Sequence, residues 1–185
     1  MTIDDACVLR KSARILLRPW QAADAEGWFA LSQDEGFNRF SYSGYRQTSL
    51  RTAEEFILRH QAEFRETGLG VFPIVLNSTG EIIGVCALRR DQVPGESHTI
   101  IEIMYRLAAR HWQKGFASEA AALLLEYAFH EIRLETVYGC VELTNQASRR
   151  VLEKIGMRFA WRTISRGVEV DFFSLSAGQA SRASD

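Results

Sequence analysis

The residues best suited to chemistry precede a helix that the sequence predicts from Phe116 to about residue 130. The first backbone N–H groups of a helix have no partner inside it, so they can bind an anion such as a pyrophosphate. Gly115 lets the backbone approach such an anion closely, and Lys114 adds a positive charge. The small Ala117 and Ser118 leave space for it. A glycine before a helix is also common without a ligand, so a purely structural role stays open.

Patterns typical of other reaction classes are absent. The sequence contains neither GxxxxGKS/T nor GxGxxG, which argues against a P-loop NTPase and a dinucleotide-binding fold. The three cysteines, Cys7, Cys86 and Cys140, lie far apart without a CxxC pair, so neither a disulfide framework nor a zinc site is indicated. Cys140 has no histidine near it in the sequence, which favours a small packed side chain over a nucleophile. We therefore expect no metal.

The composition is that of an ordinary globular protein. The 185 residues are enough for one domain spanning 1–185, with 46% hydrophobic and 24% charged residues. The 22 Lys and Arg nearly cancel the 23 Asp and Glu, so the overall charge gives no reason to expect nucleic acid or an anionic membrane as partner, and we expect neither. No signal peptide or long apolar run is apparent. These features predict a cytoplasmic protein.

The order of predicted elements is mixed α and β. Residues 49–66 have apolar positions at helical spacing, with Thr52 and Glu55 spaced as a capping box and Gly68 at the end. Strands are predicted at 14–18, 71–76, 81–88, 99–107, 136–141, 159–165 and 168–175, with further helices at about 22–32 and 145–155. The core is expected over about residues 12–175, followed by a frayed tail at 176–185.

Six short segments follow one another in a characteristic order: Arg14-Ile-Leu-Leu-Arg-Pro-Trp20, Gly80-Glu-Ile-Ile-Gly84, Glu102-Ile-Met-Tyr105, Trp112-Gln-Lys-Gly-Phe-Ala-Ser-Glu-Ala120, Asn145-Gln-Ala-Ser148 and Glu153-Lys-Ile-Gly-Met-Arg-Phe159. In this order they resemble the GNAT superfamily of N-acetyltransferases, and more narrowly its ribosomal-protein N-terminal acetyltransferase branch, the RimJ/RimL type. Each segment is weak evidence alone. Together they extend over about residues 12–175, nearly the whole chain.

The resemblance implies an α+β GNAT fold, a mixed and mostly antiparallel central sheet flanked by helices. In this fold the strands at 99–107 and 136–141 splay apart and form the cleft that binds acetyl-coenzyme A. Backbone groups of Leu107 would contact the pantetheine arm, and Asn145 would fix either that arm or the adjacent helix cap. The amides implied to hold the pyrophosphate are those of Gln113, Lys114, Gly115, Phe116, Ala117 and Ser118.

One residue departs from the pattern of this branch. The branch usually has Gly at the position of Gln113. If that position requires a positive φ, Gln is disfavoured there, although it keeps its backbone N–H. The departure leaves open a second kind of function, a coenzyme A sensor that kept the fold and lost turnover.

Acetyl transfer to an amine requires a route for the amine proton and protonation of the departing thiolate. The resemblance implies that Glu102 draws the amine proton through water and that Ser148 protonates the thiolate. Structural roles are the alternatives. Glu102 could instead pair with a nearby arginine, while Ser148 and Asn145 could cap the helix that follows them.

The expected reaction is direct attack of a primary amine on acetyl-coenzyme A. An α-amine, with an ordinary pKa of about 8, loses its proton more readily than a lysine side chain at about 10.4. This favours a protein N-terminus or an amino-acid-like acceptor, and the resemblance also allows other small-molecule amines. Transfer of a bulkier or acidic acyl group such as succinyl would need a cation in the cleft, for which Arg106 is a candidate. Both a monomer and a homodimer are compatible with the sequence.

Overall fold

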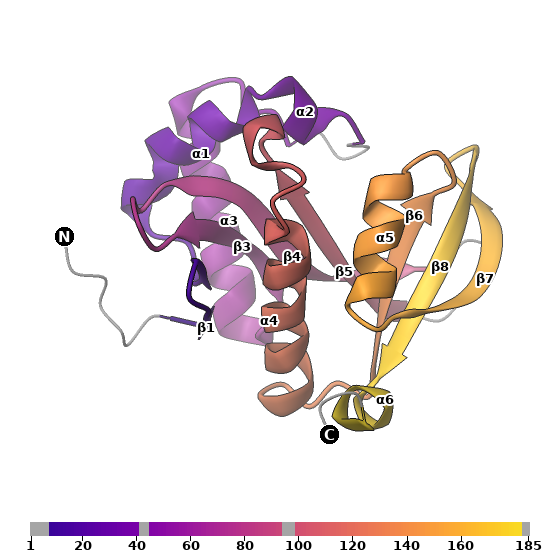
Figure 1. Cartoon of the computed structure of the whole chain (residues 1–185). Coiled ribbons are helices and arrows are strands. Elements are labelled where there is room, and N and C mark those ends of the chain that lie inside the picture. The colour runs from indigo at the N-terminus through magenta and orange to yellow at the C-terminus, as the bar shows by residue number, and fades with distance from the viewer. Residues whose placement is uncertain (1–7, 41–44, 94–98, 183–185) are drawn as a thin grey trace.

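The computed structural model describes residues 8–40, 45–93 and 99–182, whose arrangement is shown in Figure 1. Its helices are α1 (Ala25–Ser32), α2 (Glu35–Asn38), α3 (Leu50–Thr67), α4 (Phe116–His130), α5 (Gln146–Lys154) and α6 (Ala177–Arg182), with short 3-10 turns η2 (Ala22–Asp24) and η3 (Ala109–His111). Its strands are β1 (Arg10–Lys11), β2 (Ile15–Leu17), β3 (Gly70–Leu76), β4 (Ile82–Gln92), β5 (Thr99–Leu107), β6 (Thr136–Glu142), β7 (Arg158–Ser165) and β8 (Val168–Ser176).

The strands of the described residues form one mixed sheet in the order β1-β2-β3-β4-β5-β6-β8-β7. Neighbours are antiparallel except β5 and β6, which are parallel. In the described structure, β5 and β6 have a single pair of Cα partners, Glu102 and Tyr138, and Figure 1 shows the two strands diverging. The predicted fold class is therefore confirmed, and Glu102 lies where the strands meet.

Alternation along β5 sends its side chains into two different cores. Ile103 and Leu107 join a cluster that includes residues of α4 and α5. Met104 joins a second cluster with Trp28 of α1 and Phe56 of α3. The sheet thus has an α4–α5 face, which includes Tyr105 at the edge of the first cluster, and an α1–α3 face.

Local hydrogen bonds explain where α3 begins and ends. The hydroxyl of Ser49 accepts a hydrogen bond from the Thr52 amide at 3.2 Å, and the Thr52 hydroxyl accepts one from the Ser49 amide. The capping box is therefore Ser49 with Thr52, and the predicted box of Thr52 with Glu55 is wrong, because the helix begins at Leu50. The end at Gly68 is as predicted, with a left-handed φ of 70°.

The C-terminal segment differs from the expected frayed tail. Residues 177–182 form α6 directly after β8. The Gln179 side chain accepts from the Ser176 amide at 3.0 Å, and the Ala177 amide donates to the Glu135 carbonyl at 3.0 Å. These bonds, with Ala177 and Ala180 packed against the core, order the start of this segment.

Candidate functional site

The loop that joins β5 to α4 has the backbone shape expected of an anion site. Gly115 immediately precedes the helix with a φ of 82°, which glycine adopts at little cost. Gln113 has a φ of 59°, so this position does require the left-handed region that disfavours glutamine. Both residues and Lys114 are exposed, whereas the side chain of Phe116 is buried in the core.

The backbone amides of this loop are free to bind a ligand. Within the described part of the chain, no protein acceptor receives the N–H groups of residues 113–118, and the first helical bond at this end joins the Glu119 amide to the Gly115 carbonyl. Consecutive free amides at the positive end of a helix suit a pyrophosphate. Ala117 and Ser118 are half-buried, and their side chains are small.

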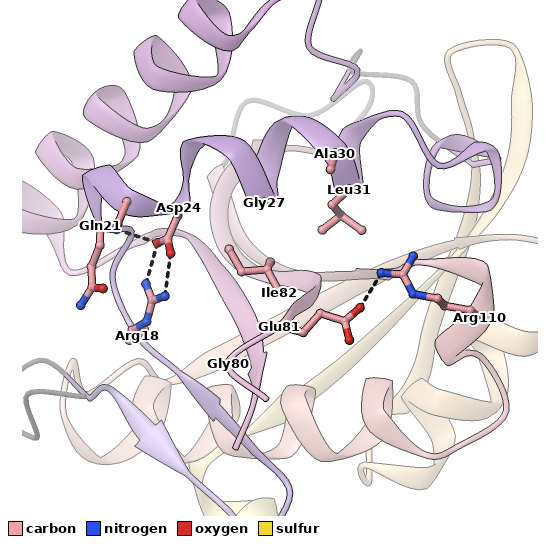
Figure 2. A pocket seen from close by; sticks show the side chains of 11 residues that line it. Arg18, Gln21, Asp24, Gly27, Ala30, Leu31, Gly80, Glu81, Ile82 and Arg110 are labelled. Carbon is pink, nitrogen blue, oxygen red and sulfur yellow. Dashed lines mark hydrogen bonds and ion pairs between the residues drawn. The ribbon is translucent and has the colours of Figure 1, made fainter. Parts of the chain in front are cut away.

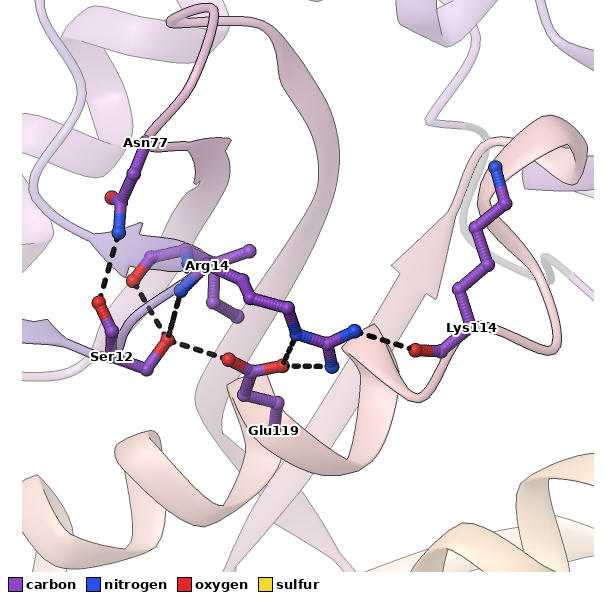
Figure 3. Close-up of polar contacts among 6 residues, drawn as sticks. Ser12, Arg14, Asn77, Lys114 and Glu119 are labelled. Atoms are coloured by element: carbon purple, nitrogen blue, oxygen red, sulfur yellow. Dashed lines mark hydrogen bonds and ion pairs between the residues drawn. The ribbon is translucent and has the colours of Figure 1, made fainter.

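Arg14 holds this loop against the helix from a distant part of the sequence (Figure 3). Its Nη1 donates to the Lys114 carbonyl at 3.0 Å, and its Nε donates to Glu119 Oε2 at 2.8 Å. The guanidinium also lies 4.5 Å from the centre of the Phe116 ring. The Ser12 hydroxyl donates to the other oxygen of Glu119 at 2.6 Å. Sequence reasoning missed Arg14 as a site residue, although it opens one of the segments that carried the resemblance.

The structure also places Leu107 and Asn145 on either side of the gap between the strands. The Leu107 carbonyl, at the end of β5, accepts from the Trp112 indole N–H at 2.9 Å, so one acceptor of this residue already has a partner. The Asn145 Oδ1 accepts from the Ser148 amide at 3.1 Å, which confirms the interpretation of Asn145 as an N-cap. Its amide nitrogen has no acceptor among the described residues and remains a donor for a ligand.

Glu102 forms a buried ion pair with Arg89, its partner across β4 and β5. Arg89 Nη2 donates to Glu102 Oε2 at 2.8 Å, and Nε donates to the same oxygen at 3.2 Å. Glu102 is only 4% exposed, and this burial raises its pKa to about 7, with Arg89 acting in the opposite direction. The structural alternative for Glu102, pairing with a nearby arginine, is therefore confirmed, while its role as a base stays a prediction. The pairing leaves a carboxylate that titrates near neutral pH, as a general base should.

Arg106 lies on the same face of β5 as Glu102 but is already engaged. Its Nη2 donates to the Phe40 carbonyl at 2.7 Å, its Nη1 donates to the Phe37 carbonyl at 3.3 Å, and its guanidinium lies 5.2 Å from the centre of the Tyr45 ring. These contacts tie β5 to the end of α2. Arg106 is therefore not a free cation awaiting an acidic acyl group.

Ser148 lies in the first turn of α5, on the other face of β5. Its Oγ is 3.0 Å from the hydroxyl oxygen of Tyr105, and the Tyr105 hydroxyl is 2.9 Å from the Ser148 carbonyl oxygen, to which it donates. The structure therefore separates the two residues proposed for proton transfer. Glu102 is on the α1–α3 face, and Ser148 is beside the α4–α5 face.

A separate hollow of about 390 Å³ lies between α1 and the turn from β3 to β4 (Figure 2). Its four charged side chains form two ion pairs, Arg18 with Asp24 and Arg110 with Glu81. It is lined by none of residues 113–118, nor by Glu102 or Ser148. This hollow is therefore distinct from the gap between β5 and β6.

Other side chains that could do chemistry have ordinary environments. Burial raises the pKa of the Cys140 thiol to about 12, which disfavours the nucleophilic thiolate. His60 lies 4.3 Å from the Phe56 ring, as a packed histidine would. Among the described residues, no cluster of His, Cys, Asp and Glu could hold a metal ion, and no helix is long and apolar enough to cross a membrane.

Comparisons with known proteins identify the family of this chain. The model of the acetyltransferase (GNAT) domain family matches residues 14–158. The uncharacterized protein YkkB of Bacillus subtilis (strain 168) is 33% identical over 147 residues, which cover 80% of this chain and 83% of YkkB. The N-acetyltransferase YoaA of the same organism, also uncharacterized, is 29% identical over 145 residues, 78% of this chain and 80% of its own.

Solved structures share the fold. The ribosomal L7/L12 α-N-protein acetyltransferase RimL, in complex with coenzyme A, superposes with a TM-score of 0.76 at 13% identity, over 91% of this chain and 97% of RimL. The microcin C7 self-immunity acetyltransferase MccE, in complex with acetyl-CoA and AMP, gives 0.74 at 16% identity, over 89% and 93%. The free amides before α4 and the single meeting point of β5 and β6 are thus found in a chain that belongs to the GNAT family of acetyltransferases.

Proposed function

We propose that this GNAT acetyltransferase transfers the acetyl group of acetyl-CoA to the α-amine of a protein N-terminus or of a small molecule, by direct attack. One observation carries the proposal. Glu102, a carboxylate with a pKa of about 7, lies where β5 and β6 meet. A base that titrates near neutral pH suits an amine whose own pKa is about 8.

The coenzyme would be held mainly by backbone groups. The free amides of residues 113–118 would bind the pyrophosphate, with the charge of Lys114 nearby. The Asn145 amide nitrogen and the backbone at Leu107 would bind the pantetheine arm. Acetyl-CoA supplies the activated acyl group, and the protein supplies position and proton transfer.

The two proton transfers would occur on opposite faces of β5. On the α1–α3 face, Glu102 would accept the amine proton through a water molecule, because the carboxylate is only 4% exposed and is already paired with Arg89. On the α4–α5 face, the Ser148 hydroxyl would donate its proton to the sulfur as the carbon–sulfur bond breaks and its electron pair stays on sulfur. Ser148 would then recover a proton from water.

The primary test is calorimetric binding of acetyl-CoA, succinyl-CoA and ATP, followed by an acceptor assay. Coenzyme A release would be measured with a peptide bearing a free N-terminus, the same peptide N-terminally blocked but retaining a lysine, and spermidine. We expect acetyl-CoA to bind selectively and the free N-terminus to react fastest. Equal turnover of the blocked peptide would contradict the α-amine assignment. Binding without turnover of any amine would favour the sensor function that Gln113 left open.

A further inference from the structure

We propose that Tyr105 is a positioning residue for the transfer reaction, holding the Ser148 hydroxyl so that it can donate to the coenzyme sulfur. The inference rests on the proposed function, because it assigns Tyr105 a role through Ser148. It adds a residue from β5 that contacts α5 across the gap between β5 and β6.

The phenol oxygen is bonded to Ser148 at two atoms. It donates to the Ser148 carbonyl oxygen at 2.9 Å, and it lies 3.0 Å from Ser148 Oγ, where either atom can be the donor. In the first arrangement, the Tyr105 hydroxyl donates to the Ser148 carbonyl oxygen, and the Ser148 hydroxyl donates to the phenol oxygen. In the second, both O–H bonds are rotated, so that the Tyr105 hydroxyl donates to Ser148 Oγ. The Ser148 hydroxyl can then donate to a ligand. Neither arrangement requires movement of the backbone.

The second arrangement makes Ser148 a better proton donor. A hydroxyl that accepts one hydrogen bond donates a stronger one, because the chain of bonds is mutually polarised. As the serine proton moves to sulfur, negative charge develops on Oγ, and the phenol is already placed to stabilise it. Tyr105 keeps its own proton throughout.

The surroundings of Tyr105 support a donor that stays protonated. Burial raises the pKa of its phenol above the ordinary value. Its partner across β4 and β5 is Cys86, which is fully buried, and burial also raises the pKa of that thiol. Neither group therefore titrates near neutral pH, and the Tyr105 hydroxyl remains available as a donor over the working range.

Tyr127 provides a matched control. Its hydroxyl also donates to a backbone carbonyl, that of Gly68, at 3.0 Å, and its ring packs in the same core cluster. It lies on α4, away from Ser148. Tyr127→Phe therefore removes a comparable hydrogen bond without touching the proposed donor.

The test titrates the thiol of coenzyme A bound to the protein, and needs no acceptor amine. The ultraviolet absorbance of the thiolate is followed against pH, with the desulfo-coenzyme A complex as the blank. A hydroxyl that donates to sulfur favours the thiolate, so wild-type protein should lower the pKa of the bound thiol. Tyr105→Phe should decrease its ionisation constant by roughly three- to tenfold, which corresponds to loss of part of one hydrogen bond. Ser148→Ala should decrease it at least as much, and the double variant should match Ser148→Ala alone.

The outcomes separate the inference from the proposed function. If wild-type protein binds neither coenzyme A nor desulfo-coenzyme A, the proposed function fails and the inference with it. If it binds coenzyme A and Tyr105→Phe titrates like Tyr127→Phe, only the inference fails. If Tyr105→Phe loses as much affinity for desulfo-coenzyme A as for coenzyme A, the role of Tyr105 is purely structural and the inference fails.

Discussion

In the mechanism proposed above, the two faces of β5 would serve opposite ends of the same reaction, and the structure equips them by different physical means. On the α1–α3 face, Glu102 is buried beside Arg89, and its pKa of about 7 results from burial opposed by a cation. On the α4–α5 face, Tyr105 and Ser148 are neutral hydroxyls joined by hydrogen bonds, next to a loop that offers free backbone amides. An ionisable group can be tuned by its surroundings, whereas hydroxyls and amides act through their orientation.

This difference has consequences for substitutions. Changes on the Glu102 face should alter rates and their pH dependence while leaving coenzyme binding intact. Changes at the loop before α4 should alter coenzyme binding first. Each experiment below tests whether that division holds.

The largest effect is expected for Glu102→Gln, which removes the base without changing side-chain size. We expect kcat/KM for the best acceptor to fall by about 100-fold, within the usual range for a general base, with the Kd of coenzyme A unchanged. Asp24→Asn is the matched control, since Asp24 is also buried and paired with an arginine but lies away from the cleft. A loss of coenzyme affinity in Glu102→Gln would break the proposed division between the faces.

Arg14→Met should weaken coenzyme A binding by roughly tenfold, because the loop loses its tie to Lys114 and to Glu119. Arg10→Met is the control. Arg10 also reaches α4 from the N-terminal strands, but it pairs with Glu131, just after the opposite end of the helix, at 2.8 Å. Calorimetry should show less than a twofold change for this variant. If both variants weaken coenzyme A binding equally, Arg14 contributes only to the stability of the fold.

Arg89→Gln should move the pH profile of kcat/KM to higher pH. Arg89 lowers the pKa of Glu102 from the value that burial alone would produce, so its removal raises that pKa further. The base must be deprotonated, so activity should rise with pH through about 7 in wild type and at higher pH in the variant. Arg90→Gln changes the next residue of β4, which points to the other face, and its profile should match wild type. An unchanged profile for Arg89→Gln would remove Glu102 as the titrating base.

The smallest effect is expected for Gln113→Gly. Glycine relieves the left-handed φ of 59° and should stabilise the fold by about 0.5–1 kcal/mol, measured by denaturant unfolding. Arg133→Gly is the control, because Arg133 has a similar φ of 56° in the turn after α4. Both should stabilise alike, but only Gln113→Gly should change coenzyme A affinity. Identical affinities of the two variants for coenzyme A would show that the strained φ of Gln113 does not affect how the loop amides bind the coenzyme.

Features set by short stretches of chain were predictable from the sequence. Strand 99–107 and the helix that begins at Phe116 have the predicted bounds. Asn145 caps α5, which was the structural alternative for this residue. Apolar periodicity, glycines and capping side chains act within a few residues, so their outcome depends little on the rest of the chain. The glycine usual at the position of Gln113 raised the possibility of a positive φ there, and the structure decided it, with a φ of 59°.

Pairings between distant segments were decided only by the tertiary structure. Arg14 reaches Glu119 across 105 residues of sequence, and Tyr105 reaches Ser148 across 43. Arg89 faces Glu102 because of the register between β4 and β5. Many arginines could have been the partner of Glu102, and no local pattern selects one. The sequence by itself therefore determined the family, most of the elements and the candidate residues, whereas register and packing decided which charges and hydroxyls meet, because those contacts exist only once the sheet has assembled.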